Sequence, residues 1–159
     1  AYVQGRARSP GLSEVLSGQA RFEDALVRRH VRQKNGAEPA GRVDMLRSGT
    51  FPPNPAELLM RPEFGQLVEV QRQRYDLVLI DTPPVLPVTD GVIVAAHAGP
   101  VFMVVRAGQT TLRETQVAIR RLEQNRVKLT GLLINDLDPT RQGLREYHYH
   151  YKYATRSND

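Results

Sequence analysis

The stretch YDLVLIDTPPVLPVTD, residues 75–90, decides the fold. Its residues 77–80 are all apolar, with polar residues before them and Pro83 and Pro84 shortly after. A run this short, rich in β-forming residues and without alternation, predicts a strand buried on both faces, as in a parallel sheet. The two prolines end the strand because proline has no N–H to donate to a ladder.

A carboxylate, Asp81, directly follows the predicted strand, and a second acid, Asp90, ends the stretch. In open α/β sheets, ligands bind beyond the carboxyl ends of the strands. A carboxylate in that place can hold Mg²⁺ on a nucleotide, directly or through water. The alternative is that Asp81 only caps the turn or the next helix, and the double proline together with Asp90 favours the ligand role.

Two further apolar runs, residues 101–105 and 129–135, predict buried strands. Between them, Thr110 or Thr111 can cap a helix that runs to about Asn125. Strand, helix and strand of these lengths form the βαβ pattern, in which the two strands are parallel and the crossover is right-handed. We therefore expect an α/β fold with a mainly parallel sheet flanked by helices.

The remaining residues predict shorter elements. Candidate helices cover residues 11–18, 55–74 with a break at Pro62, and 91–98, and candidate strands cover residues 22–33 and 42–46. The segment PPNP, residues 52–55, places a proline at the first helical position, which is typical of a stiff helix start. His30 and His97 are isolated from other potential ligands and are interpreted as structural.

The composition fits one domain without disulfides, since cysteine is absent. No apolar run approaches the roughly 18 residues that a membrane-spanning helix needs. The formal net charge is +5, and the arginines are scattered, with Arg120 and Arg121 interpreted as part of a solvated helix face. A solvated basic surface is favoured, an anionic partner such as headgroups or nucleotide stays open, and no nucleic-acid partner is expected.

The motifs resemble those of the bacterial tyrosine kinases, a family with a P-loop ATPase fold that acts in exopolysaccharide and capsule export. LVLIDTPP followed by VTD resembles the family's Walker B region. The family's other motifs occur in the same order: GLSEVLSG, PPNP-x-ELL, VVRAGQTTL, GLLIND and a tyrosine-rich tail. The resemblance covers nearly the whole chain from Gly11 onward. The phosphate-binding motif G-x-x-x-x-G-K-[ST] and the family's second acidic motif do not occur in these residues.

The resemblance implies an ATP-dependent protein-tyrosine kinase. Asp81 would organise Mg²⁺ and the incoming hydroxyl, Thr82 would lie beside the nucleotide, and Asp90 is a further catalytic candidate. For Asn135 the residues alone favour a turn amide, whereas the resemblance implies that its side chain holds adenine. The phosphate-loop strand is central in this fold class and is absent here, so we expect these residues to fold poorly alone and to belong to a longer protein.

Four tyrosines, Tyr147, Tyr149, Tyr151 and Tyr153, occupy alternate positions near the end of the sequence. They can be a cluster of phosphorylation substrates, an ordinary disordered end, or part of a ligand site with His148 and His150, although two histidines make a weak metal site. The resemblance implies the first use, with phosphorylation between neighbouring copies. We accordingly divide the chain into a portion of the P-loop kinase domain, residues 1–137, and a flexible tyrosine-rich tail, residues 138–159.

The resemblance also implies a setting for the molecule. It is that of a cytoplasmic domain of a bacterial inner-membrane protein, which forms a homo-oligomer and regulates exopolysaccharide chain length and export. The implied partners are neighbouring copies, a membrane chain-length or activator segment, and the polysaccharide export machinery. Two alternatives stay open: a partition-type ATPase, against which the tyrosine tail argues, and a catalytically inactive interaction module, which the missing phosphate loop allows.

Overall fold

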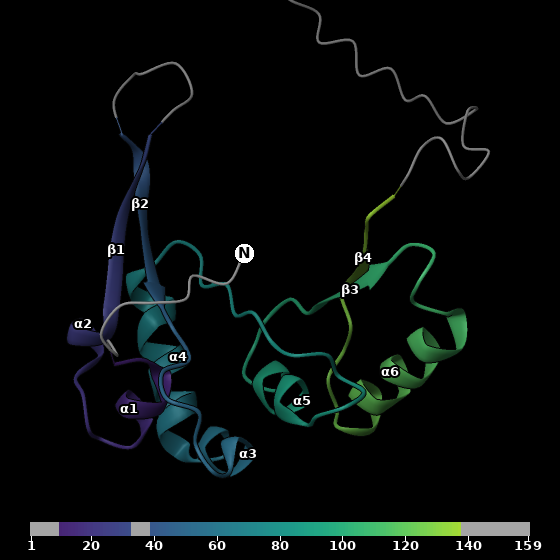
Figure 1. Ribbon diagram of the computed structural model, residues 1–159, viewed down its shortest axis with the longest axis horizontal. Coiled ribbons are helices and arrows are strands. Elements are labelled where there is room, and N and C mark those ends of the chain that lie inside the picture. Colours follow the sequence, from purple (N-terminus) through teal and green to yellow (C-terminus); the bar gives the residue numbers. More distant parts are fainter. Residues whose placement is uncertain (1–9, 33–38, 138–159) are drawn as a thin grey trace, which may run out of the picture.

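The computed structural model describes residues 10–32 and 39–137. Its elements, in chain order, are α1 Leu12–Leu16, α2 Phe22–Ala25, β1 Leu26–Arg32, β2 Pro39–Leu46, α3 Pro55–Leu59, α4 Pro62–Arg74, α5 Asp90–Ala95, β3 Phe102–Arg106, α6 Leu112–Gln124 and β4 Gly131–Asn135 (Figure 1). The predicted α/β class is confirmed, and so is the break before Pro62. No helix in these two ranges has both the length and the apolarity to cross a bilayer.

The predicted βαβ unit is confirmed in the second half of the molecule. β3 and β4 pair in parallel, with Phe102 opposite Gly131 and Arg106 opposite Asn135, and α6 connects them. α6 begins with a capping box: the Thr111 hydroxyl accepts from the Glu114 N–H, and the Glu114 carboxylate accepts from the Thr111 N–H at 2.8 Å. The helix cap predicted at Thr110 or Thr111 is therefore found at Thr111.

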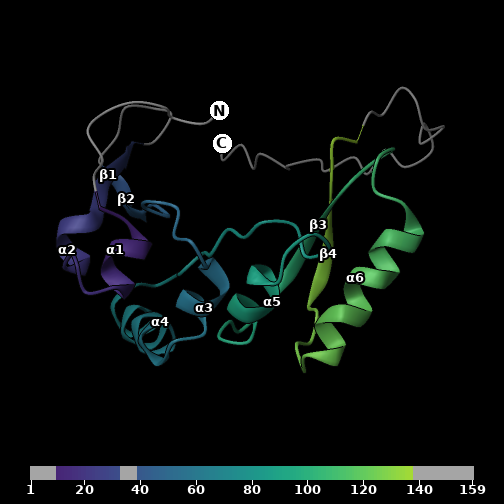
Figure 2. The same ribbon diagram turned by 60° about the horizontal axis from the view of Figure 1, so that its bottom comes forward.

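Helix α5 joins two apolar clusters. One contains the buried residues Leu16, Phe64, Val68 and Val94, and the other contains Val92, Ala95, Leu122 and Val127. Because Val94 belongs to the first cluster and its neighbours on α5 to the second, α5 holds the α1–α4 half against the β3–α6–β4 half. Figures 1 and 2 show the two halves on either side of α5.

His97 packs just after α5 in the way the sequence predicts for a structural histidine. Its ring meets the ring of Phe64 edge-on, with centroids 5.3 Å apart. Gly65 leaves the room for this contact, since a Cβ there would lie 3.0 Å from His97 Cε1. The histidine therefore fastens the end of α5 to α4.

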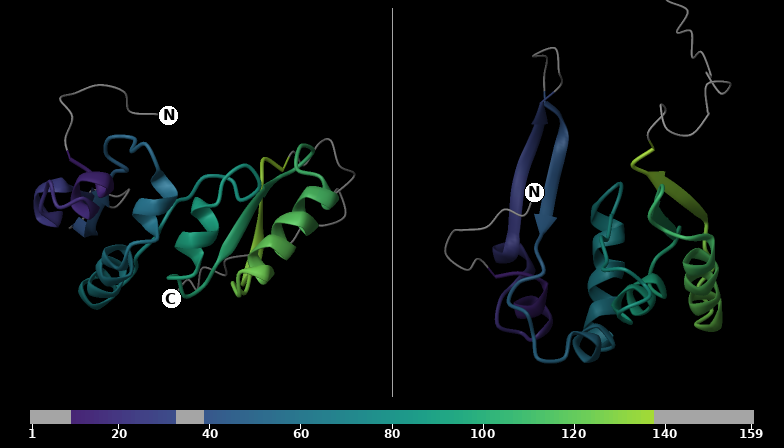
Figure 3. Two further views of the ribbon diagram at one scale, coloured as in Figure 1. Left: turned by 90° about the horizontal axis from the view of Figure 1, so that it is seen from below. Right: turned by 45° about the vertical axis from the view of Figure 1, so that its right-hand side comes forward.

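The strand predicted at residues 77–80 is wrong as a paired element. These residues form no ladder with any strand in the described ranges, and the leucines 77 and 79 are 79% and 87% exposed. The physical reason is that a strand persists only where neighbouring backbones accept and donate its hydrogen bonds. Figure 3 shows this part of the chain as a coil between α4 and α5.

Three further expectations need correction. Residues 22–25 form helix α2 rather than the start of a strand. The strand predicted at residues 42–46 begins earlier, at Pro39, and as β2 it pairs antiparallel with β1 in a separate hairpin, with Leu26 opposite Leu46. Neither β3 nor β4 is buried on both faces. In β3, Phe102 and Val104 are 54% and 62% exposed while Met103 and Val105 are half-buried, and in β4 Leu132, Leu133 and Ile134 are 43%, 52% and 59% exposed. In the described ranges, the parallel sheet thus consists of two strands that are only partly buried.

Candidate functional site

The segment after residue 80, which carries Asp81 and Thr82, passes beside the first turn of α5, which carries Asp90. Gly91 packs against this segment so closely that a Cβ would lie 3.3 Å from the Pro83 carbonyl oxygen and from Thr82 Oγ1. This approach sets the first turn of α5, which begins at Asp90, against the turn that carries Asp81 and Thr82. Asp81 is exposed, whereas Thr82 and Asp90 are half-buried.

The alternative role for Asp81, capping the next helix, does not match the structure. The N-cap residue of α5 is Thr89, and no side chain accepts a capping hydrogen bond there. Asp81 also has no ion-pair partner in the ranges 10–32 and 39–137. Its carboxylate is therefore available for a ligand in solvent.

The donors at this turn suit magnesium bound chiefly through a nucleotide. Within the described ranges, no group of three or more His, Asp or Glu side chains is placed to hold a metal by itself. Mg²⁺ typically keeps several waters and takes one or two carboxylates together with substrate phosphates. The carboxylates of Asp81 and Asp90 and the hydroxyl of Thr82 are hard oxygen donors of this kind.

Arg121 holds the loop that follows the two prolines. Its Nη1 donates to the Leu86 carbonyl oxygen at 2.6 Å, from a position on α6. Arg121, interpreted from the sequence as part of a solvated helix face, is half-buried, and its guanidinium also fixes residues 85–87 against α6. The Asp81 turn is thus supported from α5 on one side and, through this loop, from α6.

The segment that leads to Asp81 is anchored at its start by Tyr75. The Tyr75 hydroxyl donates to Asp44 Oδ2 at 2.7 Å, and Arg42 Nη2 lies 3.0 Å from the same oxygen. The Asp44 side chain is 2% exposed. Burial, and then the hydrogen bond to Asp44, raise the pKa of Tyr75. This contact ties β2 to the beginning of the unpaired segment.

Asn135 lies at the carboxyl end of β4. It is exposed, and its carbonyl oxygen accepts from the Ala107 N–H at 2.9 Å. Beside it, Arg106 donates from Nε to Asp136 Oδ2 at 2.8 Å and from Nη1 to Gln109 Oε1 at 3.1 Å. No ion pair within the described ranges joins this cluster to the Asp81 turn.

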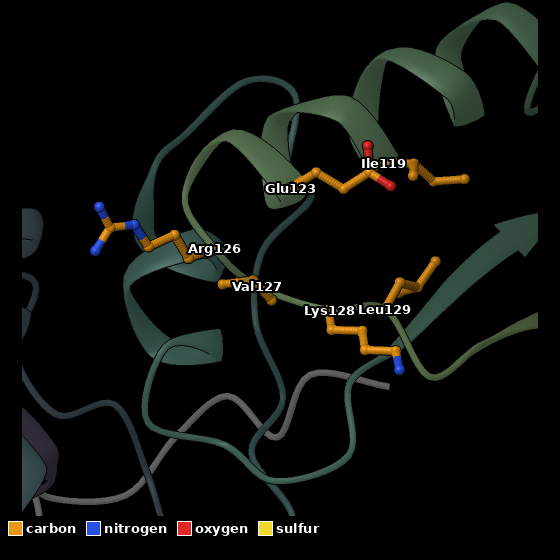
Figure 4. A pocket seen from close by; sticks show the side chains of 6 residues that line it. All are labelled: Ile119, Glu123, Arg126, Val127, Lys128 and Leu129. Carbon is orange, nitrogen blue, oxygen red and sulfur yellow. The ribbon is translucent and has the colours of Figure 1, made fainter.

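A hollow of about 540 Å³ lies at the opposite, amino end of β4. It is lined by Ile119, Glu123, Arg126, Val127, Lys128 and Leu129 (Figure 4). Figure 4 shows the side chains of Arg126 and Lys128 pointing away from each other. Because no polar groups converge there and no predicted site residue lines it, this hollow is not the candidate site.

Known proteins resemble the chain over most of its length. No protein-family model matches it. It is 38% identical over 150 residues to the tyrosine-protein kinase wzc of Salmonella typhimurium, covering 92% of this chain and 19% of that protein. It is 40% identical over 152 residues to the putative tyrosine-protein kinase EpsB of Ralstonia nicotianae, covering 94% of this chain and 19% of that protein.

A solved structure gives the same picture for the fold. The kinase domain of the Escherichia coli tyrosine kinase ETK superposes with a TM-score of 0.68 and 34% identity, covering 83% of this chain and 50% of that domain. The fold is therefore that of a P-loop ATPase-like kinase domain. The chain belongs to the bacterial tyrosine kinase family, and it spans about a fifth of the length of the curated relatives named above.

Sequence reasoning missed the contacts of Asp44 and Arg106. A charged residue in the middle of the apolar strand VDML, residues 43–46, is a usable signal, because a buried charge needs a partner. One partner, Arg42, lies two positions earlier in the same strand, whereas the other, Tyr75, lies 31 positions away and no local pattern indicates it. Arg106 gives a weaker signal, which is only its position at the end of a strand, opposite Asn135 at the end of the neighbouring strand.

Proposed function

We propose that these residues form part of the catalytic domain of an ATP-dependent protein-tyrosine kinase. The observation that carries the proposal is the turn held against Gly91, which presents the Asp81 carboxylate to solvent next to the start of α5. Family membership supports it, since the relatives that match are named tyrosine-protein kinases. The same names disfavour a partition-type ATPase.

Each residue of the candidate site has a distinct task in this proposal. Asp81, with Thr82 and Asp90 close by, would hold Mg²⁺, which when bound neutralises charge on the transferred phosphoryl group. Asp81 would also orient the tyrosine hydroxyl that receives the phosphoryl group. Asn135 offers an amide donor and an acceptor that match an adenine edge. The cradle for the phosphates is supplied, in this proposal, by polypeptide outside these 159 residues.

The apolar run 77–80 supports a longer domain. Leu77, Val78 and Leu79 are exposed and have no ladder partner in the described ranges, and apolar side chains are costly to leave in water. The solved ETK domain is only half covered by this chain. We therefore infer that residues 1–137 are a portion of the kinase domain, and that further polypeptide pairs with residues 77–80.

The substrates and partners proposed for the whole protein follow from its family. Tyr147, Tyr149, Tyr151 and Tyr153 would accept phosphates from neighbouring copies in a homo-oligomer, and they lie in residues 138–159, outside the described ranges. A membrane activator segment and the polysaccharide export machinery would be its other partners. The domain would work on the cytoplasmic side of a bacterial inner membrane and control exopolysaccharide chain length.

Changing Asp81→Asn in the complete kinase tests the proposed site. The substitution keeps the shape of the side chain but removes the charge that favours Mg²⁺, so autophosphorylation should fall by about 100-fold or more, which corresponds to about 2.7 kcal/mol of barrier. Asp76→Asn is the matched control, because Asp76 is an exposed acid just before the apolar run. The measurement is the initial rate of phosphate transfer from labelled ATP.

Two outcomes would count against the proposal. Near-normal autophosphorylation in Asp81→Asn would show that this carboxylate is not part of the catalytic site. A complete wild-type protein that transfers no phosphate with a saturating activator would instead favour the inactive interaction module.

A further inference from the structure

We propose that Arg106 is a positioning residue, whose guanidinium holds Asp136 in a left-handed conformation and thereby orients Asn135. This inference rests on the proposed function, in which Asn135 contacts adenine. Neither Arg106 nor Asp136 belongs to the set of residues predicted from the sequence. The effect concerns nucleotide affinity and leaves the chemistry at Asp81 unchanged.

The geometry places the guanidinium across two chain segments. Arg106 ends β3 and Asn135 ends β4, directly opposite each other in the parallel register. From this position, the Arg106 guanidinium reaches Asp136, the residue after β4, at 2.8 Å and Gln109, in the loop after β3, at 3.1 Å. The Ala107 N–H also donates to the Asn135 carbonyl oxygen at 2.9 Å. The two strand ends are therefore joined by backbone and by side chain.

Asp136 has a backbone conformation that needs support. Its φ is 59°, in the left-handed region that residues other than glycine seldom adopt, although Asp and Asn tolerate it better than most. Such conformations persist where the surrounding structure imposes them. Asp136 shares a peptide group with Asn135, so its φ sets the direction in which the chain leaves the proposed adenine contact. The ion pair with Arg106 is the described contact that fixes this direction.

A simple surface ion pair is the competing explanation. The side chains of Arg106 and Asp136 are 55% and 57% exposed, and pairs this exposed contribute little to global stability. The two explanations differ in what they predict. Loss of a simple surface pair lowers the stability slightly and leaves ATP affinity unchanged. Loss of a positioning pair weakens ATP affinity. That loss is reversed when residue 136 can adopt its left-handed conformation without the ion pair.

The first measurement compares Arg106→Ala with Arg113→Ala in the complete kinase. Arg113 is an exposed arginine on α6 without an ion pair in the described ranges, so it controls for the lost charge. We expect Arg106→Ala to raise the KM for ATP about fivefold while kcat stays within about twofold, because the adenine contact is equal in the ground and transition states. Arg106→Lys should be intermediate, since lysine keeps the charge but loses the planar fork.

The second measurement is a rescue. Glycine adopts positive φ without steric cost, so Asp136→Gly in the Arg106→Ala background should return the KM to within about twofold of wild type. Failure of this rescue, after a rise in KM in Arg106→Ala, would mean that Arg106 touches the nucleotide directly, and the inference would be overturned.

Amide hydrogen exchange at residues 135–137 separates this inference from the proposed function. Exchange should be faster in Arg106→Ala than in Arg113→Ala, whatever the nucleotide does. Unchanged exchange would overturn the positioning role. Faster exchange with an unchanged KM would uphold the positioning role and would show that Asn135 is not the adenine contact, so that the proposed function would lose that residue.

Discussion

Two apolar runs of similar composition have different environments in this molecule. The run that forms β3 pairs with β4 along its whole length, and alternate residues are half-buried. Residues 77–80 are equally apolar, yet they form no ladder in the described ranges, and Leu79 is 87% exposed. β3 has a partner because the next strand in the chain, β4, follows directly after the connecting helix α6. An apolar run therefore expresses a preference for strand structure, and the neighbouring backbone decides whether the strand forms.

The largest expected effect on stability comes from truncating one leucine in the β3–α6–β4 half and one in residues 77–80, both in the complete kinase. Leu122 is 2% exposed, and Leu122→Ala should lower the free energy of unfolding by about 2–5 kcal/mol through lost burial and a cavity. If further polypeptide covers residues 77–80, Leu79→Ala should have a cost in the same range. Urea denaturation measures both variants.

Leu112→Ala serves as the control for this pair. Leu112 is 74% exposed at the start of α6, and its truncation should change stability by less than about 0.5 kcal/mol. If Leu79→Ala proved as mild as Leu112→Ala in the complete kinase, residues 77–80 would not be a buried strand there.

A smaller effect is expected at the start of the unpaired segment. Tyr75→Phe removes the hydroxyl that donates to the Asp44 carboxylate, which is 2% exposed, and should lower stability by about 1–3 kcal/mol. Asp44→Asn should remove part of the same interaction, so the two changes should combine non-additively. Thermal unfolding of the two single variants and the double variant checks this, and simple additivity would show that the Tyr75 contact does not anchor the segment.

The third effect concerns acid stability in the first half of the molecule. The Glu14 carboxylate accepts hydrogen bonds from the Gly11 and Thr50 N–H groups, which join α1 to the segment before α3. The Thr50 hydroxyl, then the Gly11 and Thr50 N–H groups, lower the pKa of Glu14 from 4.5 to about 2. A lowered pKa stabilises the folded state above the unfolded value, and this contribution disappears as the pH falls from about 4.5 towards 2.

Glu14→Gln should therefore make the stability less sensitive to pH in that window. The measurement is the urea midpoint of both proteins at several pH values between about 5 and 2.5. Parallel pH profiles for the variant and the wild type would contradict this role of Glu14.

The success of sequence reasoning follows the range of each interaction. Pro55, Pro62 and Thr111 mark helix starts that the structure reproduces, because capping depends on the first turn alone. The βαβ unit was predictable because its two strands and its helix are consecutive. The lack of a ladder partner for residues 77–80 in the described ranges and the bond from Arg121 to Leu86 were not predictable, since neither leaves a local pattern. At the candidate site, the sequence predicts the carboxylate of Asp81, but it does not predict the close packing of Gly91 against Thr82.

Hydrogen exchange of the amides of residues 77–80 tests the central claim most directly. The claim is that this run is a strand leading to Asp81 that lacks its partners in the 159-residue chain. In that chain, these amides should exchange at nearly unprotected rates, while the amides of the paired β3 and β4 exchange more slowly. In the complete kinase, residues 77–80 should be as protected as β3. Strong protection in the short chain, or rapid exchange in the complete kinase, would contradict the account.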